Sequence, residues 1–312
     1  MIVRWGLREL NDTLGDVGVE RPFVVASERW THLDVPHVAW WSEVPSHRVE
    51  AAPDADGILA IGGGSAIDTA KLASARAGLP LVSVPTTYSG SEWTATFGIR
   101  SPDRRMQGGG GGARPVAIVY DVELTLDLPR AESVGTAINA LAHCAEATYV
   151  KGRSDEGDAA ALAGAAALAA ALPRVAADGS DWSARDELLH GAAHAGRALA
   201  LAGLGLAHAM AQAVGGLYGL PHGVMNALCL PPALEFNRDY VPAAFAEAVG
   251  GEPAERAREL ARPGGFGRLR DHGVPRDDLP RIAEATAQRG GNRNNPVEAT
   301  PEEIERLFAE IW

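Results

Sequence analysis

Two histidines and two amides form pairs whose spacing places each pair on one helix face, and a third histidine follows in the sequence. Asn139 and His143 are four residues apart in NALAHCAEA, and His208 and Gln212 repeat that spacing in AHAMAQAVGG, so each pair shares one face of a helix. His222 follows a proline at the start of another helical pattern. Because imidazole titrates near neutral pH, the three histidines together would form a cationic, proton-donating pocket suited to a carboxylate substrate. Any one of them alone would more often be a packed or surface residue, so this interpretation requires that they meet in space.

A second segment whose residues could bind a ligand lies in the first third of the chain. The apolar run 58–61 is short enough to be a buried strand; Gly62, Gly63 and Gly64 follow it, and Ser65 opens a helical pattern. A strand, a glycine turn and a helix N-terminus present free backbone N–H groups and the positive end of a helix dipole to an anion. Glycine also lets a phosphate approach without meeting a Cβ atom. We interpret Gly63, Gly64 and Ser65 as a pyrophosphate cradle; the alternative is an ordinary tight turn, since the GxGxxG fingerprint is absent.

The longer strings around this cradle carry a family resemblance. GGGSAIDTAK is followed, after the next apolar run, by PTTYSGSE. This combination resembles the iron-containing (group III) alcohol dehydrogenase superfamily, which also holds the dehydroquinate synthase and glycerol-1-phosphate dehydrogenase relatives. TTYSGSE is one residue shorter than the usual TTAGTGSE and is similar to the maleylacetate reductase branch. The chain end, with NPV before a helical pattern and a final tryptophan, is similar to that branch as well.

The resemblance implies an NAD(P)H cofactor and indicates which residues contact it. Beside the cradle, the matching cofactor-binding positions are Asp68, Thr86, Thr87 and Ser91. In the family the residue after the first strand reads the adenosine ribose, and Ser27 holds that place here. Because serine has no charge to repel a 2′-phosphate, NADH and NADPH both stay open. Relatives carry a lysine near Met106, and the alternatives for that charge are Arg104, Arg105 and Arg114.

The histidines resemble the superfamily pattern DxxxH…HxxxH…H, in which an Asp and three His bind Fe²⁺ or Zn²⁺. That resemblance implies a Lewis-acid metal held by His143, His208 and His222. Two positions depart from the pattern, because Asn139 replaces the Asp and Gln212 replaces a histidine. An amide in place of a carboxylate removes a negative charge and weakens a divalent site. The maleylacetate reductase branch shares the Asn but reads LPHAETH, whereas LPHGVMN here is closer to the metal-dependent alcohol dehydrogenases. We favour a site without metal, with Fe²⁺ or Zn²⁺ as the open alternative.

These features predict an NAD(P)H-dependent reductase of the maleylacetate reductase type. Hydride would pass to the activated C=C bond of a small carboxylate, converting maleylacetate to 3-oxoadipate. The three histidines and Tyr88 would polarise the substrate oxygens, and one of them would return the proton. The alternatives are a metal-dependent alcohol or aldehyde dehydrogenase, a dehydroquinate synthase-like lyase, and a non-catalytic relative that binds coenzyme without turnover.

Composition narrows the partners and the compartment. The net charge of −12 over 312 residues argues against nucleic acid or an anionic membrane and leaves a small anionic substrate to be bound by local positive potential. We expect no transmembrane segment and no secretory signal, and the two cysteines form no CxxC, so a cytoplasmic protein is expected. Base rates and the resemblance favour a homodimer.

The order of elements predicts the fold class. Alternating strands and helices followed by helices alone indicate a nucleotide-binding α/β lobe (1–128) and an all-α lobe (129–312), the dehydroquinate synthase-like arrangement. The expected strands are 23–26, 37–41, 58–61, 79–84 and 116–120, with a strand or hairpin in 93–100 and a glycine loop at 108–112. Only the short segment 28–36 joins the first two strands, where relatives have a helix. The expected helices are 133–150, 158–172, 186–204, 206–217 and 224–234, with a final helix that begins in a capping box at Thr300.

Overall fold

The computed structural model of the chain describes residues 1–100, 106–109 and 113–312. Two compact units make up the protein, unit 1 from Met1 to Leu126 and unit 2 from Asp127 to Trp312. The sequence placed this boundary after residue 128. Arg104, Arg105 and part of the predicted glycine loop at 108–112 lie outside the described residues.

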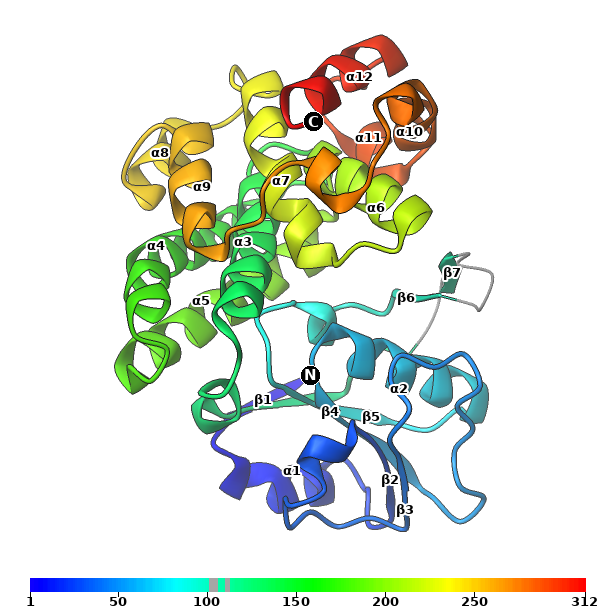
Figure 1. Ribbon diagram of the computed structural model, residues 1–312. Helices are drawn as coiled ribbons and strands as arrows, with labels where there is room; N and C mark the ends of the chain where they lie inside the picture. Colours follow the sequence, from blue (N-terminus) through cyan, green and yellow to red (C-terminus); the bar gives the residue numbers. More distant parts are fainter. Residues whose placement is uncertain (101–105, 110–112) are drawn as a thin grey trace. The chain divides into compact units, whose positions relative to one another are not determined.

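Unit 1 is built on a six-stranded parallel sheet in the order β1-β8-β5-β4-β2-β3 (Figure 1). Its strands are β1 (Ile2–Trp5), β2 (Pro22–Val25), β3 (Ala39–Trp41), β4 (Gly57–Gly62), β5 (Leu81–Pro85) and β8 (Ala117–Tyr120). A separate antiparallel pair is formed by β6 (Phe97–Arg100) and β7 (Met106–Gly109). The predicted α/β class of the N-terminal part is confirmed.

Helices cover both faces of this sheet, which is why its strands read as continuous apolar runs. Leu59 and Ile61 belong to a core that includes Leu10 and Leu14, on one side of the sheet, where α1 (Leu10–Asp16) lies. Ile58 lies on the opposite face, with the apolar side of α2 (Gly64–Ala77). Burial on both faces therefore fixes the central strand β4, and with it the position of the glycine turn that follows.

The sequence did not predict strand β1. IVRW is short, and its side chains are mostly half-buried at the sheet edge, where β1 pairs with β8. The segment between β2 and β3 holds only the single 3₁₀ turn Glu28–Trp30, so the expected absence of a helix there is confirmed.

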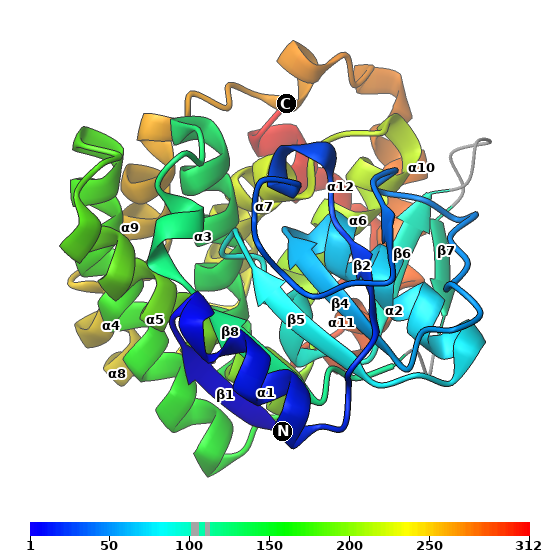
Figure 2. The ribbon, with the colours of Figure 1, turned by 90° about the horizontal axis from the view of Figure 1, so that it is seen from below.

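Unit 2 consists of helices, as predicted. They are α3 (Arg130–Ala147), α4 (Asp155–Ala177), α5 (Trp182–Ala202), α6 (Leu206–Tyr218), α7 (His222–Phe236), α8 (Ala243–Val249), α9 (Pro253–Ala261), α10 (Leu279–Ala287), α11 (Gly290–Asn294) and α12 (Pro301–Glu310). Helices α3, α4 and α5 pack on one another (Figure 2), and α7 packs on α3 and α6. The predicted bounds differ most at α4, which begins earlier and runs past Pro173.

Helix α4 departs from one expectation of the sequence. It contains an 18-residue window of mean hydropathy 1.6, so by length and composition alone it passes as a membrane-spanning helix. In the structure 56% of that window is buried inside the protein, as in the core helix of a bundle. Helices α5 and α6 pass only as a pair, and that pair is bent by 98°. Helices of this kind are weak evidence for a membrane span.

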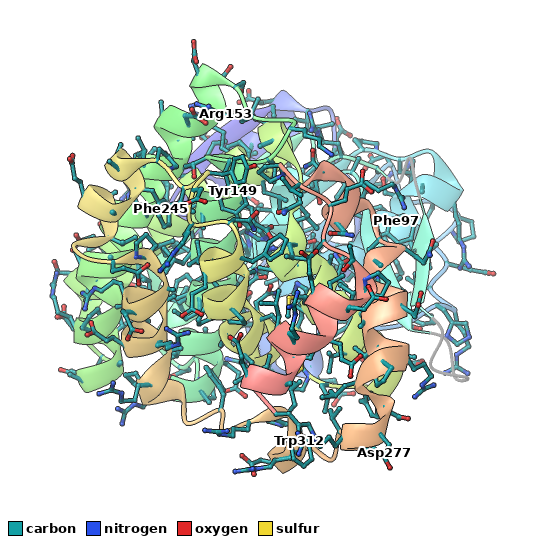
Figure 3. The ribbon with its side chains drawn as sticks, turned by 90° about the horizontal axis from the view of Figure 1, so that it is seen from above. Phe97, Tyr149, Arg153, Phe245, Asp277 and Trp312 are labelled. Carbon is teal, nitrogen blue, oxygen red and sulfur yellow. The ribbon has the colours of Figure 1, made fainter. Side chains whose placement is uncertain are left out.

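The chain end is fixed by its helix cap and its last side chain. The predicted capping box is confirmed: Glu303 N–H donates to Thr300 Oγ1 at 3.2 Å, and Thr300 N–H donates to Glu303 Oε2 at 2.9 Å. Trp312 donates its Nε1–H to Val274 O at 2.8 Å and lies under the Arg276 guanidinium, 5.4 Å from the ring centre (Figure 3). The tryptophan that follows α12 therefore holds this end of the chain against the loop that precedes α10.

Candidate functional site

The glycine turn of unit 1 forms an open helix N-terminus. Gly62 ends β4 with a φ of +150°, and Gly63 is the N-cap of α2. Among the described residues no side chain caps this helix. Ala66 N–H donates to Gly63 O at 3.0 Å, so the N–H groups of Gly64 and Ser65 are the ones offered to a ligand. A Cβ atom on Gly63 would lie 2.8 Å from Thr87 Cγ2, closer than van der Waals contact permits. Glycine at 63 thus keeps the mouth of the turn clear, and the exposed Ser65 stands beside it.

The loop after β5 lies directly against this turn. Thr86 N–H donates to Gly62 O at 3.0 Å, and a Cβ on Gly64 would be in van der Waals range of Ser89 and Ser91. The structure therefore gathers the following predicted cofactor residues into one patch: Gly63, Gly64, Ser65, Thr86, Thr87 and Ser91. This patch stands at the carboxyl ends of two neighbouring parallel strands.

Ser27 lies at the same edge of the sheet, after β2. Strand β2 pairs with β4 in parallel on the side away from β5. The chain proceeds from β2 to β3 toward one edge and from β4 to β5 and β8 toward the other, so its direction reverses between β2 and β4. Ligands of open α/β sheets bind at such a reversal, outside the carboxyl ends of the strands.

Asp68 is engaged within the protein. Its Oδ1 accepts from Ser91 Oγ at 2.6 Å and its Oδ2 from Gly98 N–H at 2.9 Å. The buried Lys71 lies 3.6 Å from the same carboxylate and donates to Ser91 Oγ at 2.9 Å and to Thr96 O at 2.8 Å. Burial lowers the pKa of Lys71, while the charges of Asp68 and Glu92 oppose that shift. Asp68 and Lys71 thus fix the loop that carries Ser91, a positioning role for the D and K of the motif.

The same loop is held from its other side by a buried carboxyl group. Tyr120 donates its hydroxyl to Glu92 Oε1 at 2.7 Å, and Trp93 Nε1–H donates to the Tyr120 hydroxyl at 2.7 Å. Burial raises the pKa of Glu92. The predicted catalytic residue Tyr88 belongs to this loop of unit 1, and its side chain is fully buried.

In unit 2 the three histidines come together from three helices. His143 lies on α3, His208 on α6, and His222 is the first residue of α7. The His143 and His208 rings stack with centres 4.6 Å apart and planes at 12°, and the His222 ring centre is 5.7 Å from that of His208. His143 and His208 are buried, and His222 is exposed.

A buried carboxylate that sequence reasoning missed fixes His208. Glu146 Oε2 lies 2.6 Å from His208 Nδ1, and Oε1 accepts from the His208 backbone N–H at 3.1 Å. Glu146 is fully buried, so one side chain both caps the N-terminal turn of α6 and orients the imidazole ring. Its position three residues after His143 on α3 was the available signal, since residues i and i+3 share a helix face.

Two amides continue the network from His208 to His222. Asn226 Nδ2 lies 2.8 Å from Asn139 Oδ1, 3.0 Å from His222 Nε2 and 3.2 Å from His222 O. Because a backbone carbonyl only accepts, the Asn226 atom must be the NH₂ group, and the Asn139 atom that faces it must be oxygen. His208 Nε2, 3.2 Å from that oxygen, is then a donor. Hydrogen bonding therefore assigns a proton to Nε2 of His208, while Nδ1 of the same ring faces the Glu146 carboxyl group at 2.6 Å.

Close approach of two helices makes this amide contact possible. A Cβ on Gly223 of α7 would lie 2.7 Å from the backbone carbon of Gly135 on α3. Only glycine at this crossing lets the backbones meet so closely. Asn139 is one turn after Gly135 and Asn226 is three residues after Gly223, so the crossing delivers both amides to the same place.

The electrostatics differ from the sequence-based expectation in one respect. Burial lowers the pKa of His143 well below its ordinary value, and the neighbouring His208 and His222 lower it further. His143 is therefore neutral near pH 7, and its Nδ1 has no hydrogen-bond partner among the described residues. The expectation that all three histidines share a cationic pocket is wrong for His143.

The observed donor set does not fit Fe²⁺ or Zn²⁺. Asn139 Oδ1 already accepts from His208 and Asn226, and the lone pair of His222 Nε2 is taken by the Asn226 amide. Gln212, at the position of the missing histidine, instead accepts from Arg289 through Oε1 at 3.3 Å and through its backbone O at 3.1 Å. No cluster of three or more His, Cys, Asp or Glu suited to a metal occurs among the described residues. The Asn226 amide thus stands among the atoms that a metal would need.

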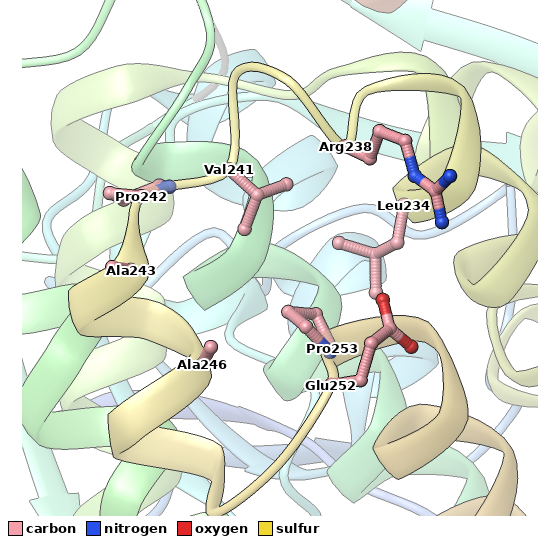
Figure 4. A pocket seen from close by; sticks show the side chains of 8 residues that line it. All are labelled: Leu234, Arg238, Val241, Pro242, Ala243, Ala246, Glu252 and Pro253. Carbon is pink, nitrogen blue, oxygen red and sulfur yellow. The ribbon is translucent and has the colours of Figure 1, made fainter.

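A cavity of about 90 Å³ in unit 2 lies elsewhere. It is lined by Leu234, Arg238, Val241, Pro242, Ala243, Ala246, Glu252 and Pro253 (Figure 4). Leu234 is twelve residues along α7 from His222, roughly 18 Å along the helix axis. Ligand pockets typically measure about 300–1,000 Å³. This small cavity is therefore no candidate for the chemistry of the histidine cluster.

Comparison with known proteins relates both units to one family. Residues 47–122 match a family model described as iron-containing alcohol dehydrogenase, and residues 133–312 match the C-terminal model of the Fe-containing alcohol dehydrogenase family. The chain is 34% identical over 313 residues to maleylacetate reductase 1 of Cupriavidus pinatubonensis, covering 93% of this chain and 88% of that protein. It is 36% identical over 305 residues to the maleylacetate reductase of Pseudomonas knackmussii, covering 90% and 87%. An iron-containing alcohol dehydrogenase structure from Corynebacterium glutamicum superposes with a TM-score of 0.90 at 30% identity, covering 100% of this chain and 94% of that one.

Proposed function

This chain belongs to the iron-containing alcohol dehydrogenase family, and we propose that within it the protein is an NAD(P)H-dependent maleylacetate reductase. The predicted family, fold class and oxidoreductase activity are confirmed by the comparisons. The observation that carries the finer assignment is the amide network at the metal position, together with maleylacetate reductase relatives at 34% and 36% identity over most of the chain.

The residues of the cradle fit a dinucleotide. Gly63 and Gly64 keep an uncapped helix N-terminus open to the pyrophosphate, and Thr87 lies beside it at the carboxyl edge of the sheet. Ser27 follows β2 at the carboxyl edge of the same sheet, which supports a contact with the adenosine ribose. When bound, the nicotinamide supplies hydride to one carbon of the substrate C=C bond, whose electrons move onto the conjugated carbonyl oxygen.

The histidine cluster would stabilise that negative oxygen. His222 is the most accessible of the three histidines, and because its Nε2 accepts from Asn226, the proton of its neutral ring is on Nδ1. We assign two roles to the His222 ring: its Nδ1–H polarises the substrate oxygen, and the ring passes one proton from the medium to the second alkene carbon. His208 and neutral His143 form the buried wall behind it.

The test is oxidation of NADH or NADPH driven by maleylacetate, with protein dialysed against a chelator and its metal content measured. Turnover that survives dialysis in metal-free protein is the expected result. No turnover with coenzyme still bound would refute the assignment, and turnover restored only by Fe²⁺ or Zn²⁺ would favour a metal-dependent alcohol or aldehyde dehydrogenase.

A matched pair of variants tests the role of His222. His222→Gln should lower kcat roughly 100-fold or more, the usual contribution of a general acid. His190→Gln changes a histidine near an exposed carboxylate on α5 and should leave kcat unchanged. Equal kcat for the two variants would remove His222 from the mechanism.

We further propose that the enzyme is a cytoplasmic homodimer that uses no nucleic acid or membrane partner. The net charge of −12 supports the absence of such polyanionic partners. Multi-angle light scattering should give twice the mass of the 312-residue chain, and a monomer mass would contradict the dimer. For the coenzyme, the uncharged Ser27 supports use of both forms, and a Kd for NADPH far above that for NADH would contradict this reading.

A further inference from the structure

Arg289 is a half-buried cation with no carboxylate beside it in the described part of the chain. It stands just before α11, and among the described residues no acidic group lies within ion-pair distance of its guanidinium. Arg258 of the same unit, by contrast, pairs with both Glu235 and Glu255. A desolvated cation is costly unless it is paired. Its retention points to a partner that arrives from outside the chain.

The contacts of Arg289 hold it without neutralising it. Nη1 and Nη2 donate to the side-chain and backbone oxygens of Gln212 at 3.3 and 3.1 Å, and both acceptors are uncharged. Its Nε–H is buried and has no acceptor among the described residues. Burial lowers the pKa of Arg289. The two Nη atoms carry four N–H groups, and the bonds to Gln212 use two of them, so two Nη–H donors remain for a further acceptor.

The chain fixes Arg289 next to the histidine cluster. Gln212 follows His208 by four residues on α6, so both lie on one helix face about 6 Å apart along the axis. The segment after Arg289 is tied to the end of α5 and to the link that leads into α6, because Asn294 Nδ2 donates to Ala202 O at 3.1 Å and to Leu204 O at 2.9 Å. The cation is therefore positioned before any ligand binds.

We propose that Arg289 binds a carboxylate of the substrate and so selects for an acid over a neutral compound at the histidine site. This inference rests on the proposed function, which requires recognition of a dicarboxylate by a protein of net charge −12. The histidines do not supply this positive charge by themselves, since His143 is buried and Glu146 Oε2 lies 2.6 Å from His208 Nδ1. A guanidinium matches the geometry of a carboxylate by offering two parallel N–H donors.

The experiment compares Arg289→Gln, Arg289→Lys and the control Arg293→Gln. Arg293 is an exposed arginine on α11, four residues after Arg289, and its Nη1 donates to Gln288 O. Arg289→Gln should raise KM for maleylacetate roughly 10- to 100-fold, the scale of a lost charged hydrogen bond, with little change in the Kd of the coenzyme. Arg289→Lys should fall between, because it keeps the charge and loses the fork. Arg293→Gln should match the wild type.

A second substrate separates recognition from folding. The wild type should prefer the diacid over its monomethyl ester at the carboxyl group that Arg289 binds, and in Arg289→Gln this preference should disappear. An unchanged KM, or an equal loss for diacid and ester, would overturn the proposal.

A binding measurement keeps this proposal distinct from the proposed function. Should the wild type fail to reduce maleylacetate, calorimetric titration with adipate, a saturated six-carbon dicarboxylate, still tests Arg289. Binding by the wild type and Arg293→Gln but not by Arg289→Gln would support the site. No binding by the wild type, or equal binding by all three proteins, would overturn it.

Discussion

Removal of the Glu146 carboxylate is expected to destabilise the histidine cluster and lower the melting temperature of the protein. In Glu146→Ala, two buried donors of His208, the backbone N–H and Nδ1–H, lose their acceptors at 3.1 and 2.6 Å. Each buried unsatisfied donor costs about 1–3 kcal/mol, and breaking a buried charged pair costs about 3–5 kcal/mol in all. For a unit the size of residues 127–312, 1 kcal/mol corresponds to about 2–4 °C, so Tm should fall by roughly 6–20 °C.

Glu146→Gln separates hydrogen bonding from charge. The glutamine oxygen can accept from the His208 backbone N–H, while its NH₂ donates to Nδ1 of a neutral ring whose Nε2–H still faces Asn139. Because both contacts survive, the free energy of unfolding should stay within about 1 kcal/mol of the wild type. Maleylacetate reduction should also be largely retained by Glu146→Gln and lost by Glu146→Ala.

The assay is thermal and urea unfolding of both variants beside Glu156→Ala. Glu156 forms an exposed ion pair with Arg197 at 2.7 Å, so its removal should cost at most about 1 kcal/mol. An equal effect of Glu146→Ala and Glu156→Ala would refute the reasoning. A Glu146→Gln variant as unstable as the alanine variant would refute the hydrogen-bond directions assigned to His208.

Two further perturbations follow from the geometry. Gly63→Ala puts a methyl group 2.8 Å from Thr87 Cγ2 and should raise the Kd of NADH at least about tenfold. Thr87→Ser removes that carbon and should restore part of the affinity in the double variant. Fluorescence titration measures both Kd values, and no rescue in the double variant would contradict the steric cause. Burial lowers the pKa of His143 in the folded protein. Below about pH 6.5 the unfolded chain therefore takes up a proton at this histidine that the folded protein does not. As pH falls, the free energy of unfolding then decreases by up to about 1.4 kcal/mol per pH unit. The difference in unfolding free energy between wild type and His143→Gln should therefore shrink from pH 7.5 to 5.5, and a constant difference would contradict the assignment.

The cradle was predictable because its geometry is local. A buried strand, a glycine turn and a helix start are consecutive in the chain, so the run 58–61 and the glycines after it were enough to locate β4 and the N-terminus of α2. The edge strand β1 was not predictable in the same way. Its pairing partner β8 is more than a hundred residues away, and four half-buried residues carry little pattern.

In the histidine cluster, too, the contacts within one helix were predictable and the contacts between helices were not. The sequence by itself determined which side chains share a helix face, because positions i and i+4 follow from helix geometry: Asn139 with His143, and His208 with Gln212. Only the tertiary structure decided that Glu146 and Asn226 join them, and that Gln212 turns to Arg289. These contacts cross between helices, where a close approach such as that of Gly135 and Gly223 sets distances that no spacing along the chain encodes. The charge state depends on the same packing, since burial is what makes His143 neutral.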